Sequence, residues 1–322
     1  MRSDREQRTG GSMTVLICGS FAFDTIMLFP DRFKHHILPE QVHILNVSFL
    51  VPQMRREFGG CAGNIAYSLQ MLGGDVLPMG TVGEDFGAYA KWMDRWGVRR
   101  DHVTVVPGTF TAQAFITTDL DDNQITAFHP GAMGYAHLNS VSQAGSVSLG
   151  IVSPDGRDGM LLHAQQFASA GIPFIFDPGQ GMPMFGGPEL DAFLEQAAYL
   201  SVNDYECKLF QERTGTSLRE LAARVDALIL TKGGEGSEIH SKGKTHVIPA
   251  ARAQRIADPT GCGDAYRAGL LYGIARGMDW ETTGRIAALM GAIKIEHHGT
   301  QNHRVDPDEF SDRFRREFGY AF

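Results

Sequence analysis

The sequence predicts an α/β fold: a doubly wound, mostly parallel sheet flanked by helices, with a small β-sheet lid. Short runs of β-forming residues alternate with helical patterns through the body of the chain, as expected of a parallel sheet with helices on both faces. Early extended segments break this alternation and indicate a lid formed by residues of about 25–55 and 108–131. No repeat or long linker divides the chain, so we expect one domain over residues 13–322.

The N-terminal half contains the clearest lid signals. TVLICGS (14–20) is a continuous apolar run that ends in small residues, which suits a strand buried on both faces. HILNVSFLV (43–51) is rich in β-forming residues and predicts a strand. Apolar residues recur at helical spacing over 60–72, and two glycines end that helix. Residues 113–129 predict a hairpin, with LDDN as its turn.

The C-terminal half repeats strands and helices and then becomes helical. We expect helices around 189–198 and 217–224 and a helical region from Ala265 to Phe322, with Gly277 ending its first helix. The predicted strands are IPFIFDP (172–178), AYLSVND (198–204) and ALILTKGG (227–234), followed by the hairpin SEIHSKGKTHVIPA (237–250).

Composition excludes several classes of protein. The net charge is −8 and no basic stripe stands out, which argues against a nucleic-acid-binding protein. No segment reaches the roughly 18 apolar residues of a membrane span. The four cysteines are scattered, as is typical of reduced thiols. Residues 1–12 are polar and lack the apolar core of a secretory signal, so we expect a disordered extension and a cytoplasmic protein.

The segment DPTGCGDAYRAG (258–269) places glycines immediately before a predicted helix. The first N–H groups of a helix have no intrahelical acceptor, and the helix dipole adds partial positive charge there. Backbone without Cβ atoms at Gly261 and Gly263 can approach an anion closely. The segment therefore suits a phosphate site with Asp264 beside it. The competing interpretation is that Asp264 caps the helix.

Two N-terminal segments combine glycines with polar side chains. FGGCAGN (58–64) places Asn64 in the first turn of a helix, and an amide can both donate and accept hydrogen bonds. CGSFAFD (18–24) places Asp24 just beyond the first strand, at the sheet edge where α/β proteins bind ligands. Both patterns suit the hydroxyl groups of a sugar. Helix packing for Asn64 and a simple turn for Asp24 are the alternatives.

Two later segments suit a nucleotide. SVNDYE (201–206) spaces Asn203 and Glu206 so that both can act on hydrated Mg²⁺, although a helix cap would give the same pattern. LTKGGEG (230–236) ends a strand with three glycines, which suits backbone contacts to a nucleotide or a plain turn. GKT (243–245) lies in a predicted hairpin and lacks the earlier glycine of a P-loop. No G-x-G-x-x-G follows the first strand, so a dinucleotide dehydrogenase is poorly supported.

Together these segments resemble the ribokinase (PfkB) family of carbohydrate and nucleoside kinases. GGCAGN and DPTGCGDAYRAG resemble its two signatures, NDYE its N-x-x-E motif, and TKGGEG its nucleotide-binding turn. The similarity extends from about Thr14 to the C-terminal helices. Segments 29–51, 123–133 and 177–181 are most similar to bacterial purine nucleoside kinases of the adenosine kinase type. Cys262 departs from the alanine that many members carry.

The resemblance implies transfer of the ATP γ-phosphoryl group to the 5′-hydroxyl of a purine nucleoside, with adenosine favoured and inosine or guanosine as options. It also implies Mg²⁺, with K⁺ as an optional second cation. Separately, a strand-rich lid has edges that could pair between subunits, so we expect a homodimer through the lid. A sugar kinase of the ribokinase or fructokinase type is the alternative, and a non-catalytic nucleoside sensor is another.

The implied roles fall into five groups: proton acceptor, anion-binding turn, ribose, base, and ATP with its metal. The proton acceptor is Asp264, and the anion-binding turn is Gly261, Cys262 and Gly263. The ribose hydroxyls are held by Asp24, Gly60 and Asn64, with Ser20 as a further substrate-binding residue, and the base lies near Phe128 and Gln180, with Phe115 as a secondary candidate. Asn203, Thr231, Gly233 and Gly236 contact ATP, and Glu206 reaches Mg²⁺ through water.

Overall fold

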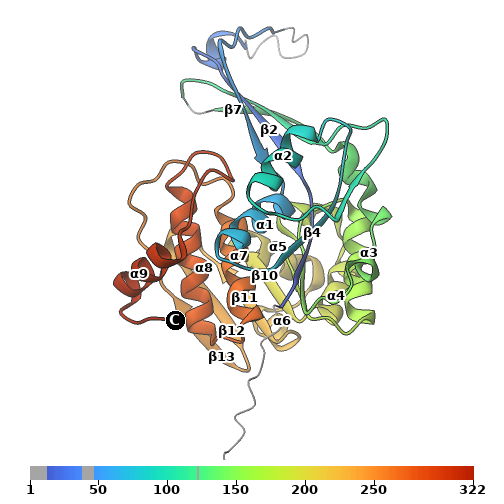
Figure 1. The fold of residues 1–322 in the computed structure, drawn as a ribbon, viewed down its shortest axis with the longest axis vertical. Helices are drawn as coiled ribbons and strands as arrows, with labels where there is room; N and C mark the ends of the chain where they lie inside the picture. The colour runs from blue at the N-terminus through green and yellow to red at the C-terminus, as the bar shows by residue number, and fades with distance from the viewer. Residues whose placement is uncertain (1–12, 38–46, 122) are drawn as a thin grey trace, which may run out of the picture.

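The computed structural model describes residues 13–37, 47–121 and 123–322, which form a large sheet with helices and a smaller sheet that projects from it (Figure 1). The large sheet has the strand order β13-β12-β11-β10-β9-β8-β1-β4-β5 and is parallel except for the pairings of β11 with β12 and of β12 with β13. Its strands are β1 (Val15–Cys18), β4 (Val76–Val82), β5 (His102–Val105), β8 (Leu149–Val152), β9 (Phe174–Phe176), β10 (Tyr199–Asn203), β11 (Ala227–Thr231), β12 (Ser237–Ser241) and β13 (Lys244–Ile248).

The chain reverses direction across this sheet at β1. From β1 it continues through β4 to β5 on one side, and later through β8 to β11 on the other. The pairing of β1 with β8 is therefore a topological switch point, where open α/β sheets leave a crevice at the carboxyl ends of their strands. The expected doubly wound architecture is confirmed.

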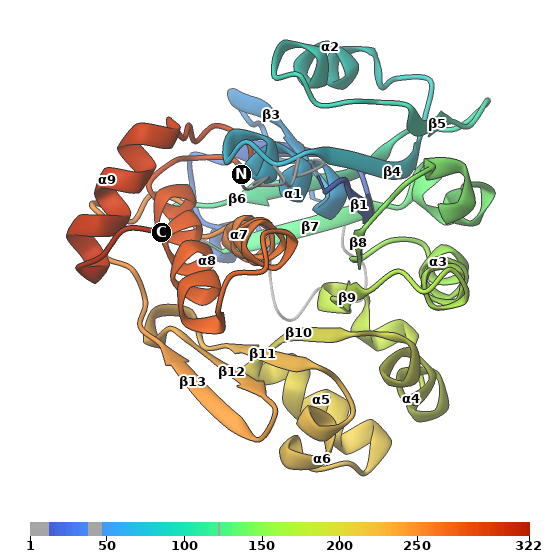
Figure 2. The same ribbon diagram turned by 60° about the horizontal axis from the view of Figure 1, so that its bottom comes forward.

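Helices cover both faces of the sheet (Figure 2). α1, α7 and α8 lie on one face, and α3 to α6 lie on the other. Their bounds are α1 (Cys61–Met71), α2 (Gly87–Arg95), α3 (Arg157–Ser169), α4 (Gly187–Gln196), α5 (Asp204–Thr214), α6 (Leu218–Ala223), α7 (Cys262–Ala275), α8 (Trp280–Ile295) and α9 (Pro307–Phe318).

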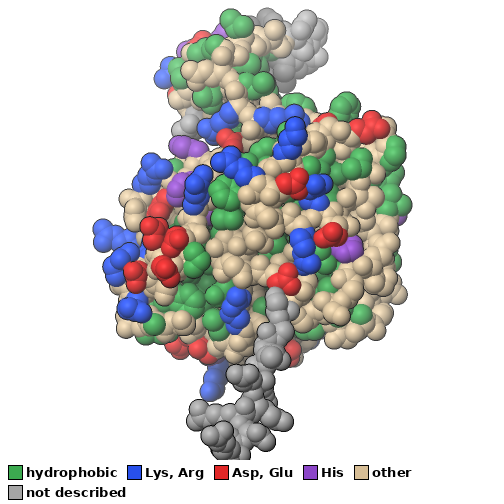
Figure 3. Space-filling view, viewed as in Figure 1, with side chains coloured by type: hydrophobic (Ala, Val, Ile, Leu, Met, Phe, Trp, Pro, Cys, Tyr) green, Lys and Arg blue, Asp and Glu red, His purple; other side chains and the backbone are tan. Residues whose placement is uncertain are grey.

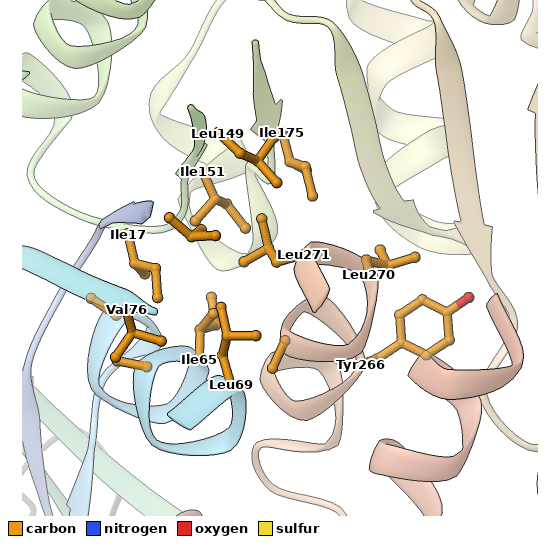
Figure 4. Packing of buried hydrophobic residues seen from close by; sticks show 14 of the residues in the cluster. Ile17, Ile65, Leu69, Val76, Leu149, Ile151, Ile175, Tyr266, Leu270 and Leu271 are labelled. Carbon is orange, nitrogen blue, oxygen red and sulfur yellow. The ribbon is translucent and has the colours of Figure 1, made fainter. Parts of the chain in front are cut away.

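Alternate residues of the buried strands supply the two cores. In β1, Val15 and Ile17 join the core on the α1 and α7 face, whereas Leu16 and Cys18 join the opposite one. A continuous apolar run therefore suits this strand, as the sequence predicts. On the first face, the apolar side chains of α1 and α7 meet those of the central strands (Figure 4), among them Ile65, Leu69, Leu270 and Leu271 against Ile17, Ile151 and Ile175.

The lid is a four-stranded sheet with the order β3-β2-β6-β7. Its strands are β2 (Ala22–Leu28), β3 (Gln53–Gly59), β6 (Ala112–Thr118) and β7 (Gln124–His129). The predicted hairpin over 113–129 is confirmed as β6 and β7. β3 and β7 form the edges, where unpaired backbone groups could join a second copy, so the homodimer stays a prediction.

Two sequence-based assignments differ from the structure. Residues 43–46 of the predicted strand 43–51 lie outside the described residues, and 47–51 form no strand. Instead Phe49 packs against Phe29 and Phe33, and the strand begins at Gln53. The predicted helical region from Ala265 breaks at Gly277, as expected, and is also interrupted over 296–306, where Gly299 adopts a positive φ of 74°.

Charged side chains of both signs lie on the surface: Figure 3 shows Lys and Arg mixed with Asp and Glu over α9 on the visible face. Within residues 13–37, 47–121 and 123–322, no helix combines the length and apolarity needed to cross a membrane.

Candidate active site

A cavity of about 910 Å³ lies at the carboxyl edge of the large sheet, where the lid strands and the start of α7 border it. Successive parallel strands supply its floor, because residues that follow β1, β8, β9, β10 and β11 all line it. All but three of the predicted site residues line this single cavity: Ser20, Asp24, Gly60, Asn64, Phe128, Gln180, Asn203, Glu206, Thr231, Gly233, Gly261, Gly263 and Asp264.

Phe115 is the first exception, and strand geometry explains it. Asp24 of β2 pairs with Ala114 of β6, which pairs with Phe128 of β7. Directly paired residues point to the same face of a sheet, so these three share the face that lines the cavity. Phe115 follows Ala114 and therefore points to the other face, where its side chain is exposed.

Gly236 and Cys262 are the other two exceptions. Gly236 has a φ of +91°, and a Cβ there would lie 2.2 Å from the carbonyl oxygen of Ile248, so this glycine shapes a turn. The N–H of Cys262 donates to the carbonyl of Pro259 at 3.2 Å, which engages the group predicted to bind an anion. Burial raises the pKa of the Cys262 thiol to about 11, so the thiol stays protonated at neutral pH.

The glycine turn forms the N-terminus of α7. Gly261 is the residue that caps this helix and adopts a left-handed φ of 81°. A Cβ on Gly261 would lie 3.0 Å from Cγ2 of Thr300. Glycine thus meets both a conformational and a steric requirement. N–H groups in the first turn of α7, including that of Gly263, lack intrahelical acceptors and border the cavity.

Asp264 lies in the first turn of α7 and does not cap the helix with its side chain. Its Oδ2 accepts a hydrogen bond from Nδ2 of Asn64 at 2.8 Å, which joins α7 to α1. Oδ1 of Asn64 accepts in turn from Nε2 of Gln301 at 3.0 Å, and that bond orients the amide. The two glycine-rich segments of the sequence therefore meet at one carboxylate.

Burial raises the pKa of Asp264 to about 6. The hydrogen bond from Asn64 lowers the pKa, the charge of Asp177 raises it, and the charge of Arg267 lowers it. A carboxylate with this pKa is ionised at neutral pH and can accept a proton there. Burial also raises the pKa of Asp24 to about 6, and the charges of Glu57 and Asp258 add to the shift.

A buried ion pair beneath the cavity was not predicted. Arg267 of α7 donates to both oxygens of Asp177, from Nε at 3.0 Å and from Nη2 at 2.9 Å. Both side chains are buried, and such a two-bond pair fixes the guanidinium in one orientation. The pair brings the Arg267 guanidinium within one helical turn of Asp264, with its charge balanced by that of Asp177. The sequence contained a partial indication, because Asp177 lies near the end of a predicted strand (172–178) and Arg267 lies three residues beyond Asp264.

Asp155 also lines the cavity and was missed by the sequence analysis. It follows β8, is only 2% exposed, and accepts the N–H of Gly156 on Oδ1 at 2.9 Å. Its Oδ2 has no hydrogen-bond partner among the residues that the structure describes. Burial raises the pKa of this carboxyl to about 8. In the sequence, only its position shortly after the segment that forms β8 could have indicated a place in the site.

Asn203 and Glu206 form the helix cap that the sequence left as an alternative, and they also line the cavity. Oδ1 of Asn203 accepts from the N–H of Glu206 at 2.7 Å, and Oε2 of Glu206 accepts from the N–H of Asn203 at 2.8 Å. No group of three His, Cys, Asp or Glu side chains suited to a metal occurs in the described ranges. This donor set fits Mg²⁺ that keeps several waters and is held mainly by substrate phosphates.

Comparisons with known proteins agree with the resemblance seen in the motifs. A family model described as pfkB family carbohydrate kinase matches residues 23–307. The nucleoside kinase of Methanocaldococcus jannaschii is 31% identical over 312 residues, which cover 95% of this chain and 99% of that protein. A nucleoside kinase of Methanothermobacter thermautotrophicus is also 31% identical, over 95% of this chain and 97% of its own.

Among solved structures, the chain is likewise similar to a nucleoside kinase. The structure of Burkholderia thailandensis nucleoside kinase in complex with inosine has a TM-score of 0.87 and 55% identity, with coverage of 95% of this chain and 99% of that one. The same kinase in complex with ADP-inosine has a TM-score of 0.85 and 56% identity, over 95% and 97% of the two chains.

Proposed function

Because the chain belongs to the pfkB family of carbohydrate kinases, we propose that it is a nucleoside kinase that transfers the γ-phosphoryl group of ATP to the 5′-hydroxyl of a purine nucleoside. One observation carries the proposal: a single cavity connects the lid residue Phe128, the carboxylate of Asp264 and the turns after β10 and β11. That span offers separate places for a base, a reacting hydroxyl and a nucleotide. The inosine complex of the similar Burkholderia kinase supports a purine substrate.

Each part of the cavity takes one task in this proposal. Asp24 and Asn64 hold the ribose hydroxyls, with Ser20 and Gly60 beside them. Asp264 orients the 5′-hydroxyl and accepts its proton. The proton can move late because phosphoryl transfer passes through a loose transition state, so a carboxylate of pKa about 6 suffices.

The anion-binding turn and the nucleotide side complete the proposed mechanism. N–H groups at Gly261 and Gly263 stabilise charge on the transferred group. Thr231 and Gly233, at the end of β11, contact ATP. When bound, Mg²⁺ neutralises phosphate charge, and Asn203 and Glu206 hold its water shell.

A screen of ATP consumption tests this function. Purified protein is incubated with ATP and Mg²⁺ and with adenosine, inosine, guanosine, ribose or fructose. Turnover with a purine nucleoside and formation of its 5′-monophosphate are expected, with inosine among the substrates. Turnover confined to free sugars would establish the sugar kinase alternative, and binding without turnover would identify a sensor. The screen also ranks adenosine against inosine.

The two lid phenylalanines make a matched test of base stacking. Phe128→Ala should raise the KM for a purine nucleoside about tenfold, because stacking of a base on an aromatic ring contributes about 1–3 kcal/mol. Phe115→Ala removes a ring of the same size from the opposite face and should leave KM within about twofold. Steady-state kinetics measure both. Equal effects of the two variants would contradict the placement of the base.

The two raised pKa values predict an acidic limb in the pH profile. Asp264 must be ionised to accept a proton, and Asp24 must be ionised to accept two hydroxyl hydrogen bonds. Both have pKa values of about 6 in the free protein. Therefore kcat/KM should fall below pH 6 with a limiting slope near 2, and Asp24→Asn should reduce that slope to 1. A profile that is flat between pH 5 and pH 8 would contradict this assignment.

A further inference from the structure

Lys294, near the end of α8, is a buried cation that the proposed mechanism does not use. Its side chain is 0% exposed. The ammonium Nζ donates to the carbonyl oxygen of Asp258 at 2.7 Å and to that of His297 at 3.2 Å. Burial lowers the pKa of Lys294, and the charges of Asp258, Asp264 and Glu57 oppose that shift. The ammonium is therefore held by two backbone carbonyls from separate loops.

Those two loops build the anion-binding turn. The carboxylate of Asp258 accepts the N–H of Thr260, which begins the turn, and the N–H of Gly299, each at 2.9 Å. Thr300 follows Gly299 and lies against Gly261. Lys294 and Asp258 thus fasten the loop before α7 to the loop after α8. The position of the turn depends on that connection, and donors in such a turn must be fixed before the reaction.

Joining two loops through a buried ammonium has a large desolvation cost. Removing a charge from water costs several kcal/mol, and an apolar side chain of the same length would avoid that cost. Backbone carbonyl oxygens are also the ligands with which proteins hold monovalent cations. At Lys294 two carbonyl oxygens likewise contact a monovalent cation, but here the cation is the ammonium of a side chain.

On the premise that the protein is the nucleoside kinase proposed above, we propose that Lys294 is a positioning residue for phosphoryl transfer. Its ammonium supplies the charge and the carbonyl contacts that a bound monovalent cation would supply, and it holds the turn Thr260–Gly263 in place. The enzyme therefore needs no K⁺ for activity.

Two variants and one salt series test this. Kinetics of the wild type and the variants are measured in KCl, NH₄Cl and tetramethylammonium chloride at equal ionic strength. Wild-type kcat should agree within about twofold in all three salts. Lys294→Met keeps the length of the side chain but not the charge, and should lower kcat about 30-fold while nucleoside KM changes less than threefold. This loss is smaller than for a direct donor because Lys294 acts through the loops.

Lys294→Ala leaves a space beside the two carbonyls. Its kcat should fall similarly and recover about tenfold in NH₄Cl but not in tetramethylammonium chloride, whereas Lys294→Met should not recover because the side chain fills the space. Lys208→Met, at an exposed lysine of α5, is the control and should match the wild type. Thermal melts followed by circular dichroism establish that each variant is folded.

Three results would overturn the inference: a wild type that depends on K⁺, Lys294→Met with unchanged kcat, or recovery of Lys294→Ala by tetramethylammonium. A wild type that phosphorylates no nucleoside in any salt would instead overturn the proposed function.

Calorimetric titration with ADP in the same salts measures nucleotide affinity in the absence of catalysis, and so tests whether the turn Thr260–Gly263 is in place. Equal ADP affinity of the wild type in KCl and tetramethylammonium chloride is expected, and affinity that requires K⁺ would overturn the inference by this route as well.

Discussion

Replacement of Asp264 by asparagine should lower kcat about 10³-fold while nucleoside affinity changes less than threefold. Loss of a positioned base typically costs between about 10² and 10⁴ in rate. The amide has nearly the shape of the carboxylate, and its oxygen can still accept the hydrogen bond that Asn64 donates at 2.8 Å. The geometry of the site should therefore survive, and only the proton acceptor is lost.

Single-turnover kinetics and calorimetry separate these two effects. Calorimetry with the nucleoside gives the affinity, and quenched-flow assays give the rate of phosphoryl transfer. Asn64→Ala is the companion variant, because it removes the partner of Asp264 but keeps the carboxylate, and it should retain more activity than Asp264→Asn. More than about 10% of wild-type turnover in Asp264→Asn would contradict the assignment of the base.

Asp24→Ala should weaken nucleoside binding about 100-fold. A hydrogen bond to a charged group contributes about 1.5–3 kcal/mol, and the Asp24 carboxylate is proposed to accept from ribose hydroxyls. Its position is well defined, because Oδ2 lies against Gly59, where a Cβ would be only 2.6 Å away. Isothermal titration with inosine or adenosine measures the change.

Glu57→Gln is the matched control for Asp24. Glu57 is the direct cross-strand neighbour of Asp24 on β3, but it is not part of the cavity lining. The variant removes a nearby negative charge and should leave the affinity within about threefold. Unchanged affinity in Asp24→Ala, or an equal loss in Glu57→Gln, would rule out a direct role for Asp24 in holding hydroxyls.

Local patterns in the sequence were sufficient to locate 13 of the 28 residues that line the cavity. Glycines before a helix, as at Gly60 and Gly261, have a conformational reason that is visible in the sequence. Polar residues at strand ends, such as Asn203, follow from the edge at which α/β sheets bind ligands. These signals need no knowledge of which segments touch.

Features that depend on distant contacts were not predicted. Asp177 and Arg267 are 90 residues apart, and neither residue type by itself indicates a buried pair. Phe115 and Phe128 are both aromatic lid residues, and only the pairing register shows that they face opposite ways. The edge strand Gln53–Gly59 was missed because its residues are mostly charged or exposed and lack an apolar stripe.

The hydrogen bond between Asn64 and Asp264 joins residues 200 positions apart, and this has a consequence for synthesis of the protein. A ribosome adds roughly 5–20 residues per second, so at least about ten seconds separate the synthesis of the two partners. During that interval the nascent chain contains α1 with Asn64 but not α7 with Asp264. The chain therefore forms the hydrogen bond between Asn64 and Asp264 only after its C-terminal helices have been synthesised.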